Sequence, residues 1–192
     1  MKKTFKLLLS AAILFSATLS ANAQLLKKEK FSVPDPMHFG VRGGVNFNTF
    51  THYETYAFPT AGVALDYKLT PTAPIFIGAG LSYVNYVLAD GRELDEYQST
   101  LHIPVTLSYH INVAPHLFIN PFAGFFGAYY LHTTFDESLN YGFRIGCGMN
   151  FKRLTFDVAY DAGLASHKQW ESEGLKSSTV FLTVGFNFVG KR

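Results

Sequence analysis

The sequence contains little charge and a single cysteine, and each of these features excludes classes of protein. Cys147 is the one cysteine among 192 residues, so the chain can form neither an intrachain disulfide nor a cysteine-based zinc finger. Charged residues make up 16% of the chain, against about 25% in an ordinary domain. With 16 Lys and Arg against 14 Asp and Glu, the chain lacks the basic balance that nucleic-acid binding requires.

Long apolar runs are also missing beyond the N-terminal region. The two most hydrophobic later segments are residues 73–89 and 117–131, and both contain Gly, Pro and Asn. Neither reaches the ~18 uninterrupted apolar residues of a membrane helix. What the chain has instead is 19 Phe, 11 Tyr and 16 Gly, a composition that excludes intrinsic disorder.

The N-terminal residues have the pattern of an export signal. Lys2, Lys3 and Lys6 precede an apolar core over residues 7–19, and Ala-Asn-Ala at 21–23 is the small-x-small pattern of a cleavage site. We therefore predict a cleaved signal peptide over residues 1–23, since the core is too short for a membrane anchor. Residues 24–37 are polar with two prolines, and we interpret them as a periplasmic N-terminal leader.

From residue 38 onward, apolar residues alternate with small or polar ones at a period of two. This alternation predicts β-strands, and eight such segments predict a closed sheet. The fifth segment is apolar on both faces, so its inward and outward residues stay open. The expected strands are residues 39–48, 62–69, 75–83, 101–110, 117–131, 139–151, 154–161 and 179–188.

The expected connectors alternate between short and long. The short ones are residues 70–74, 112–116 and 152–153, and the long ones are residues 51–58, 89–100, 132–138 and 166–177. Outer-membrane barrels show this pattern, with tight periplasmic turns and longer external loops. A soluble lipocalin-like ligand-binding barrel would instead point its large apolar face inward.

The composition of the two faces favours the membrane barrel. The polar face consists mostly of Gly, Ala, Ser, Thr and Asn with few charges, which suits the narrow interior of an eight-stranded barrel. The face of Leu, Val, Ile, Phe and Tyr suits lipid. We predict an all-β, eight-stranded antiparallel up-and-down transmembrane β-barrel over residues 38–190, located in the cell outer membrane with its lipids as partners.

Several strand motifs resemble those of a known family. They are FGVRGGVN at residues 39–46, LHIP at 101–104, Ala123-Gly124, YGFRIGCG at 141–148 and FNF at 186–188. Over about residues 38–190 the chain resembles the small outer-membrane β-barrel family of Bacteroidetes-type bacteria, which includes PorT-like proteins. The resemblance implies an eight-stranded barrel in the outer membrane and no shared reaction. PorT-like members are associated with type IX secretion, so a subunit of an envelope or secretion machine is one interpretation. The final strand, with its aromatic Phe188, resembles the signal read by the outer-membrane assembly machinery.

Candidate catalytic and metal-binding residues are few. His102 and His110 share one strand face but would lie ~27 Å apart, and none of the seven histidines has metal-ligand spacing. The acidic segment 90–96 lacks the spacing of an EF-hand.

Ser166-His167 and His132-Thr-Thr134 are the hydroxyl–imidazole neighbours, but adjacent strand residues face opposite sides. We therefore predict no catalytic site, cofactor or metal, with a lipid-modifying hydrolase as the alternative. Trp170 and Cys147 are expected in the interfacial girdle and on the lipid face, respectively.

A two-residue turn at Lys152-Arg153 would fix the register of the flanking strands. That register puts Arg144 directly opposite Asp161 on the interior face. We also expect Arg42, Asp66, Lys68 and Asp157 in the interior, which gives three positive and three negative charges arranged as structural charge pairs. Inward Phe76 and Phe181 leave little open lumen. The sequence therefore predicts a closed, non-enzymatic barrel whose external loops bind an unknown protein partner or ligand.

Overall fold

The computed structural model describes residues 35–50, 55–89, 95–131, 139–164 and 177–189. The predicted signal peptide over residues 1–23 and most of the leader over residues 24–37 lie outside this part of the chain. None of the described residues forms a helix long and apolar enough to cross a membrane.

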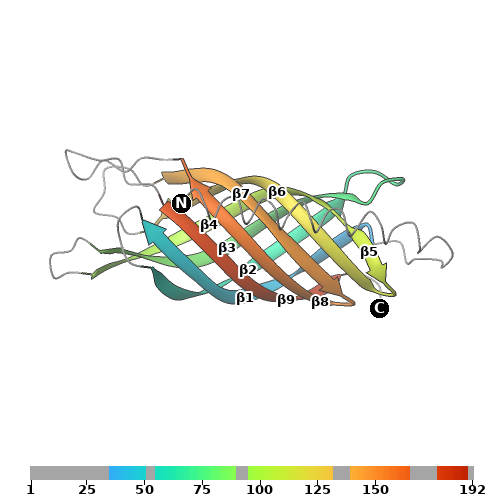
Figure 1. Cartoon of the computed structure of the whole chain (residues 1–192), viewed down its shortest axis with the longest axis horizontal. Coiled ribbons are helices and arrows are strands. Elements are labelled where there is room, and N and C mark those ends of the chain that lie inside the picture. Colours follow the sequence, from blue (N-terminus) through green and yellow to red (C-terminus); the bar gives the residue numbers. More distant parts are fainter. Residues whose placement is uncertain (1–34, 51–54, 90–94, 132–138, 165–176, 190–192) are drawn as a thin grey trace, which may run out of the picture. The chain divides into compact units, whose positions relative to one another are not determined.

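The described residues form antiparallel strands in one closed sheet (Figure 1). The strands are β1 (Met37–Phe50), β2 (Tyr56–Lys68), β3 (Ile75–Ala89), β4 (Asp95–Tyr109), β5 (Ile111–Ala114), β6 (Leu117–Tyr130), β7 (Leu139–Phe151), β8 (Leu154–Gly163) and β9 (Ser177–Val189). Strands adjacent in sequence pair with each other, except β4 and β5, and β1 pairs with β9 to close the ring. Because β4 and β5 both pair with β6, they share one position in the wall. The predicted all-β, eight-stranded up-and-down barrel is confirmed.

Three predicted connectors are wrong in length. β2 already begins at Tyr56, so the connector expected over residues 51–58 is shorter, and β4 begins at Asp95 instead of residue 101. β5 occupies most of the expected turn over residues 112–116 and leaves only Pro115-His116. The cause is the same in each case: hairpin pairing, for example Ala89 with Asp95, continues after the apolar alternation ends. Backbone hydrogen bonds require no apolar side chain.

The two faces of the wall differ as the alternation predicted. Large apolar side chains point outward, with exposed fractions from 37% for Met37 to 62% for Phe125. On β6, which is apolar on both faces, Phe126 and Tyr130 are buried while Phe125 and Tyr129 are exposed. A soluble lipocalin-like barrel would bury the opposite face. An apolar belt around the whole barrel is instead the surface that a lipid bilayer requires.

The β7–β8 hairpin has the predicted register. Lys152 and Arg153 form its two-residue turn, and Phe151 pairs with Leu154. Arg144 consequently lies opposite Asp161, and Gly148 lies opposite Asp157. Because side chains alternate along a strand, both aspartates face the barrel interior.

Candidate functional site in the barrel interior

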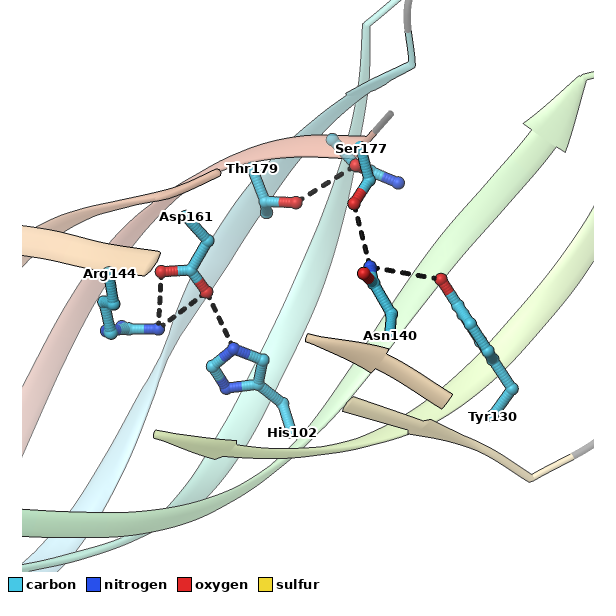
Figure 2. Close-up of polar contacts among 8 residues, drawn as sticks. His102, Tyr130, Asn140, Arg144, Asp161, Ser177 and Thr179 are labelled. Atoms are coloured by element: carbon cyan, nitrogen blue, oxygen red, sulfur yellow. Dashed lines mark hydrogen bonds and ion pairs between the residues drawn. The ribbon is translucent and has the colours of Figure 1, made fainter. Parts of the chain in front are cut away.

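The interior of the barrel is filled by inward side chains in successive levels. The level nearest the long connectors is polar and uncharged. Asn140 Nδ2 donates to Ser177 Oγ at 2.8 Å and lies 3.5 Å from the hydroxyl of Tyr130 (Figure 2). Thr179 Oγ1 donates to Asn48 Oδ1 at 3.1 Å. These hydrogen bonds join residues of β1, β6, β7 and β9 at the end of the interior nearest the long connectors.

A charged cluster lies at the next level, centred on Asp161. Arg144 Nη1 donates to both carboxylate oxygens of Asp161, at 3.2 and 3.0 Å. The ring nitrogen Nε2 of His102 lies 2.7 Å from Asp161 Oδ2, and in Figure 2 the two partners approach the carboxylate from different strands. Since Asp161 is 2% exposed and His102 is 1% exposed, these hydrogen bonds replace the water that would otherwise solvate the carboxylate.

Aromatic rings enclose this charged cluster. The ring of His102 lies 5.2 Å from the ring of Phe126 and 5.2 Å from that of Phe181, measured between centroids. The guanidinium carbon of Arg144 lies 4.7 Å from the centroid of Phe181, which is a cation–π distance. The rings cover Asp161, which does not line the neighbouring cavity, whereas His102 and Arg144 also border that cavity. The buried carboxylate therefore depends on its two partners.

A polar cavity lies below the cluster, toward the short turns. It has a volume of about 120 Å³, and Arg42, Asp66 and Asp157 are among its lining residues. Arg42 Nε lies 3.5 Å from Asp157 Oδ2, and Arg42 Nη1 donates to Asn187 Oδ1 at 3.0 Å. A polar cavity of this size has room for several water molecules. The charges at this level therefore border a space that water can enter, in addition to contacting one another.

Stacked rings occupy the end of the interior near the short turns. The ring centroids of Phe76 and His110 are 3.9 Å apart, and His38 stacks 5.7 Å from Phe76. Phe76 has no exposed surface, and Ser108 Oγ lies 3.2 Å from His110 Nε2. The turn end is thus filled by flat rings, whereas the level above it contains the cavity.

Of the six charged residues expected in the interior, four form two ion pairs, and the other two, Asp66 and Lys68, do not take part in them. The structure brings Arg144 to Asp161 and Arg42 to Asp157, and it places Asp66 on the wall of the same cavity. Lys68 lies on the same strand face, opposite the buried Phe76, but its Nζ donates to the carbonyl of Pro71 at 3.2 Å in the β2–β3 turn. Lys68 is the last residue of β2, so its long side chain reaches the turn instead of the ion pairs.

Sequence reasoning missed His102 as a partner of Asp161. The inward position of His102 followed from the alternation, but β4 and β8 are not neighbours in the sheet. Their contact crosses the lumen and depends on how the closed barrel tilts its strands. The stack of His38 with Phe76 and His110 was missed for the same reason.

The chemistry available to the described residues is limited. His102 and Asp161 form an imidazole–carboxylate pair, but both are almost fully buried. Within the described ranges, no group of three or more His, Cys, Asp and Glu side chains could hold a metal ion. Cys147 is exposed on the outer face, as expected. The neighbours Ser166-His167 and His132-Thr-Thr134, the segment 90–94 and Trp170 lie outside the described residues.

Comparisons with known proteins find likeness in fold only. No protein-family model matches the chain, and no curated protein matches it. Among solved structures, the chain is similar to the N-terminal β-barrel domain of Pseudomonas aeruginosa OprF, with 14% identity and a TM-score of 0.47 over 81% of this chain and 100% of that one. Neisserial surface protein A is 9% identical with a TM-score of 0.48, over 82% and 100% of the two chains. The outer membrane enzyme PagL is 15% identical with a TM-score of 0.44, over 74% and 97%. At these values the likeness carries no statement about function, and the narrower resemblance to PorT-like proteins stays a prediction.

Proposed function

We propose that this protein is an exported, non-enzymatic barrel of the outer membrane, closed to ions, that acts as a scaffold for a protein partner in the cell envelope. The observation that carries the proposal is the contrast between the two faces of its wall. The outside is a continuous apolar belt, and the inside is filled by hydrogen-bonded polar groups and aromatic rings.

The outer face supports a membrane location. Large apolar side chains such as Leu107, Phe125 and Val158 are about half exposed in the isolated chain. Exposed to water, an apolar surface of this extent would drive association or aggregation. In a bilayer the same side chains contact acyl chains, and the closed ring of strands leaves no unpaired sheet edge in the lipid. Together with the predicted signal peptide, this favours the outer membrane.

The inner face supports a closed barrel. His102, Phe126, Asp161 and Phe181 are each no more than 5% exposed, and they lie at one level of the lumen. Ions crossing this level would have to displace the ion pair and the rings around it. The cavity below it is therefore an internal space instead of a conducting pore.

The buried positions of His102 and Asp161 also support a non-enzymatic role. A general base must lie within hydrogen-bond reach of a substrate group, and neither residue has a surface to offer. A subunit of an envelope or secretion machine fits a barrel of this kind, because such a role requires an anchored surface and no reaction.

The first experiment tests location and closure together. The mature protein is expected to fractionate with the outer membrane and to migrate anomalously on a gel when it is not heated. In planar bilayers it is expected to give no stable conductance. Recovery from the soluble periplasm would contradict the membrane assignment, and regular single-channel steps would contradict the closed interior.

The second experiment tests topology and partner. Epitope tags near Glu54, Glu93, Asp136 and Trp170 are expected to be accessible on intact cells, while tags near Pro71, Pro115 and Lys152 are not. Labelling of the Lys152 turn from outside would invert the topology. Crosslinked pull-down from native outer membranes then separates a machine subunit from a free-standing barrel, and a lipid-hydrolysis screen on the same preparation would reveal an enzyme.

A further inference from the structure

Two neighbouring turns at one point of the barrel rim carry basic side chains. Lys152 and Arg153 form the β7–β8 turn, and His116 lies in the turn between β5 and β6. The backbone N–H of Lys152 donates to the carbonyl of His116 at 3.1 Å, which joins the two turns. We call this group of three residues the rim cluster.

The backbone conformation of the rim cluster does not account for lysine at position 152. Lys152 has a φ of 54° and His116 a φ of 63°. Positive φ at the first residue of a two-residue hairpin loop favours Gly, and at the second central residue of a turn it favours Gly or Asn. Lysine at position 152 is thus placed where the turn alone would favour glycine, whereas histidine is among the residues enriched at positive φ. The presence of Lys152 therefore does not follow from turn geometry.

The cations of the rim cluster also lack anionic partners within the described part of the chain. The ion pairs found there involve Arg42, His102 and Arg144, and none involves Lys152 or Arg153. Arg153 Nε is buried without a hydrogen-bond partner. A buried guanidinium N–H without an acceptor is unfavourable, so the Arg153 side chain gains free energy if it turns toward an acceptor at the rim.

The position of the cluster relative to the apolar belt indicates the kind of ligand. Phe151 and Leu154 directly flank the turn, pair with each other and are 45% and 43% exposed on the outer face. Lys152 Nζ lies 5.7 Å from the centroid of the Phe151 ring. The positive charge therefore lies at the edge of the belt, at the depth where acyl chains end and phosphates begin.

We propose that the rim cluster binds the phosphate of an anionic glycerophospholipid, whose acyl chains lie along Phe151, Leu154 and the neighbouring Phe186. This proposal rests on the membrane location proposed above and names the lipid class at one site on the rim. A guanidinium beside an ammonium suits a phosphate, because both donate charge-assisted hydrogen bonds to its oxygens. The adjoining apolar belt distinguishes a lipid from a free phosphate.

The experiment compares lipid retention by variants of the mature protein folded in bilayers of phosphatidylcholine with or without phosphatidylglycerol. Native mass spectrometry measures how much phosphatidylglycerol each variant retains after release from the bilayer. The double variant K152Q/R153Q is expected to retain it about thirtyfold more weakly, given ~1 kcal/mol per basic residue at a membrane surface. The matched control is K68Q, which removes a cation at another turn whose Nζ is already bonded to Pro71.

The outcomes separate this inference from the membrane assignment. If wild type fails to fold into phosphatidylcholine bilayers, the membrane location is wrong. If it folds but K152Q/R153Q retains as much phosphatidylglycerol as wild type, or K68Q loses as much as the double variant, the rim cluster is not the site. If the double variant does not fold, raising the salt concentration on wild type is the second measurement, and it must release the lipid. Preferential retention of lipid A over phosphatidylglycerol by wild type would overturn the choice of lipid.

Discussion

Asp157 and Asp161 lie on the same face of β8, yet the barrel places them in different surroundings. Asp161 is 2% exposed and is held by Arg144 and His102 beneath aromatic rings. The side chain of Asp157 is 25% exposed, and its contact with Arg42 is longer, at 3.5 Å beside the cavity. Two charges on the same inward face therefore need not contribute equally to stability. We expect the contribution to depend on whether protein groups or water complete the surroundings of each charge.

The largest expected effect comes from removing the enclosed charge. Asp161→Asn is expected to lower the free energy of unfolding by about 3–5 kcal/mol, because Arg144 would remain in the interior without an anion. Denaturant titration of the protein folded in lipid vesicles measures this loss. Asp157→Asn is the matched control on the same strand. A loss below about 1 kcal/mol for Asp161→Asn would show that water screens the pair as it does at the surface.

A double-mutant cycle sharpens the same comparison. Arg144→Ala and Asp161→Ala are each expected to lower the unfolding midpoint, and the double variant should be no less stable than the worse single variant. The reason is that the second substitution removes a charge that the first has already left unpaired. Fully additive losses would mean that the two side chains do not stabilise each other in the membrane-bound protein.

Removing the contact across the lumen should have an intermediate effect. His102→Leu leaves Asp161 paired with Arg144 but takes away one hydrogen bond, so we expect a loss of about 1–3 kcal/mol in the free energy of unfolding. His102→Gln keeps a polar group in the same place and should lose less. Equal losses for the two variants would assign the effect to ring packing against Phe126 and Phe181 instead of to the hydrogen bond.

The cavity-lining pair should have a small effect. Asp157→Asn and Arg42→Gln are each expected to cost less than about 1 kcal/mol, because water in the cavity can solvate the charge that remains. The same titration in vesicles measures both variants. If either loss were comparable to that of Asp161→Asn, a charge beside the cavity would contribute as much to stability as the enclosed charge, which would indicate that the cavity is dry.

The parts of this interior that could be predicted are those set by neighbours in sequence. Alternation identified the inward face of β8, and a two-residue turn gave the pairing of Arg144 with Asp161. The faces of β6 could not be assigned, because both are apolar, and the contact of His102 with Asp161 requires the closed barrel. The extents of β2 and β4 were missed because backbone pairing carries no compositional signal beyond the apolar belt.

The smallest expected effect concerns Lys68, whose ammonium group bonds in the β2–β3 turn instead of to an interior carboxylate. With Lys68 bonded to Pro71 in the turn, the strand interior holds Arg42 and Arg144 against Asp66, Asp157 and Asp161. Lys68→Gln should therefore change the free energy of unfolding by no more than about 0.5 kcal/mol, as at an ordinary surface position. A loss above about 1 kcal/mol in the vesicle titration would mean that Lys68 balances Asp66 after all, and that the interior is neutral as the sequence predicted. The expected small change would leave Asp66 without a cation of its own, beside the cavity where water can reach it.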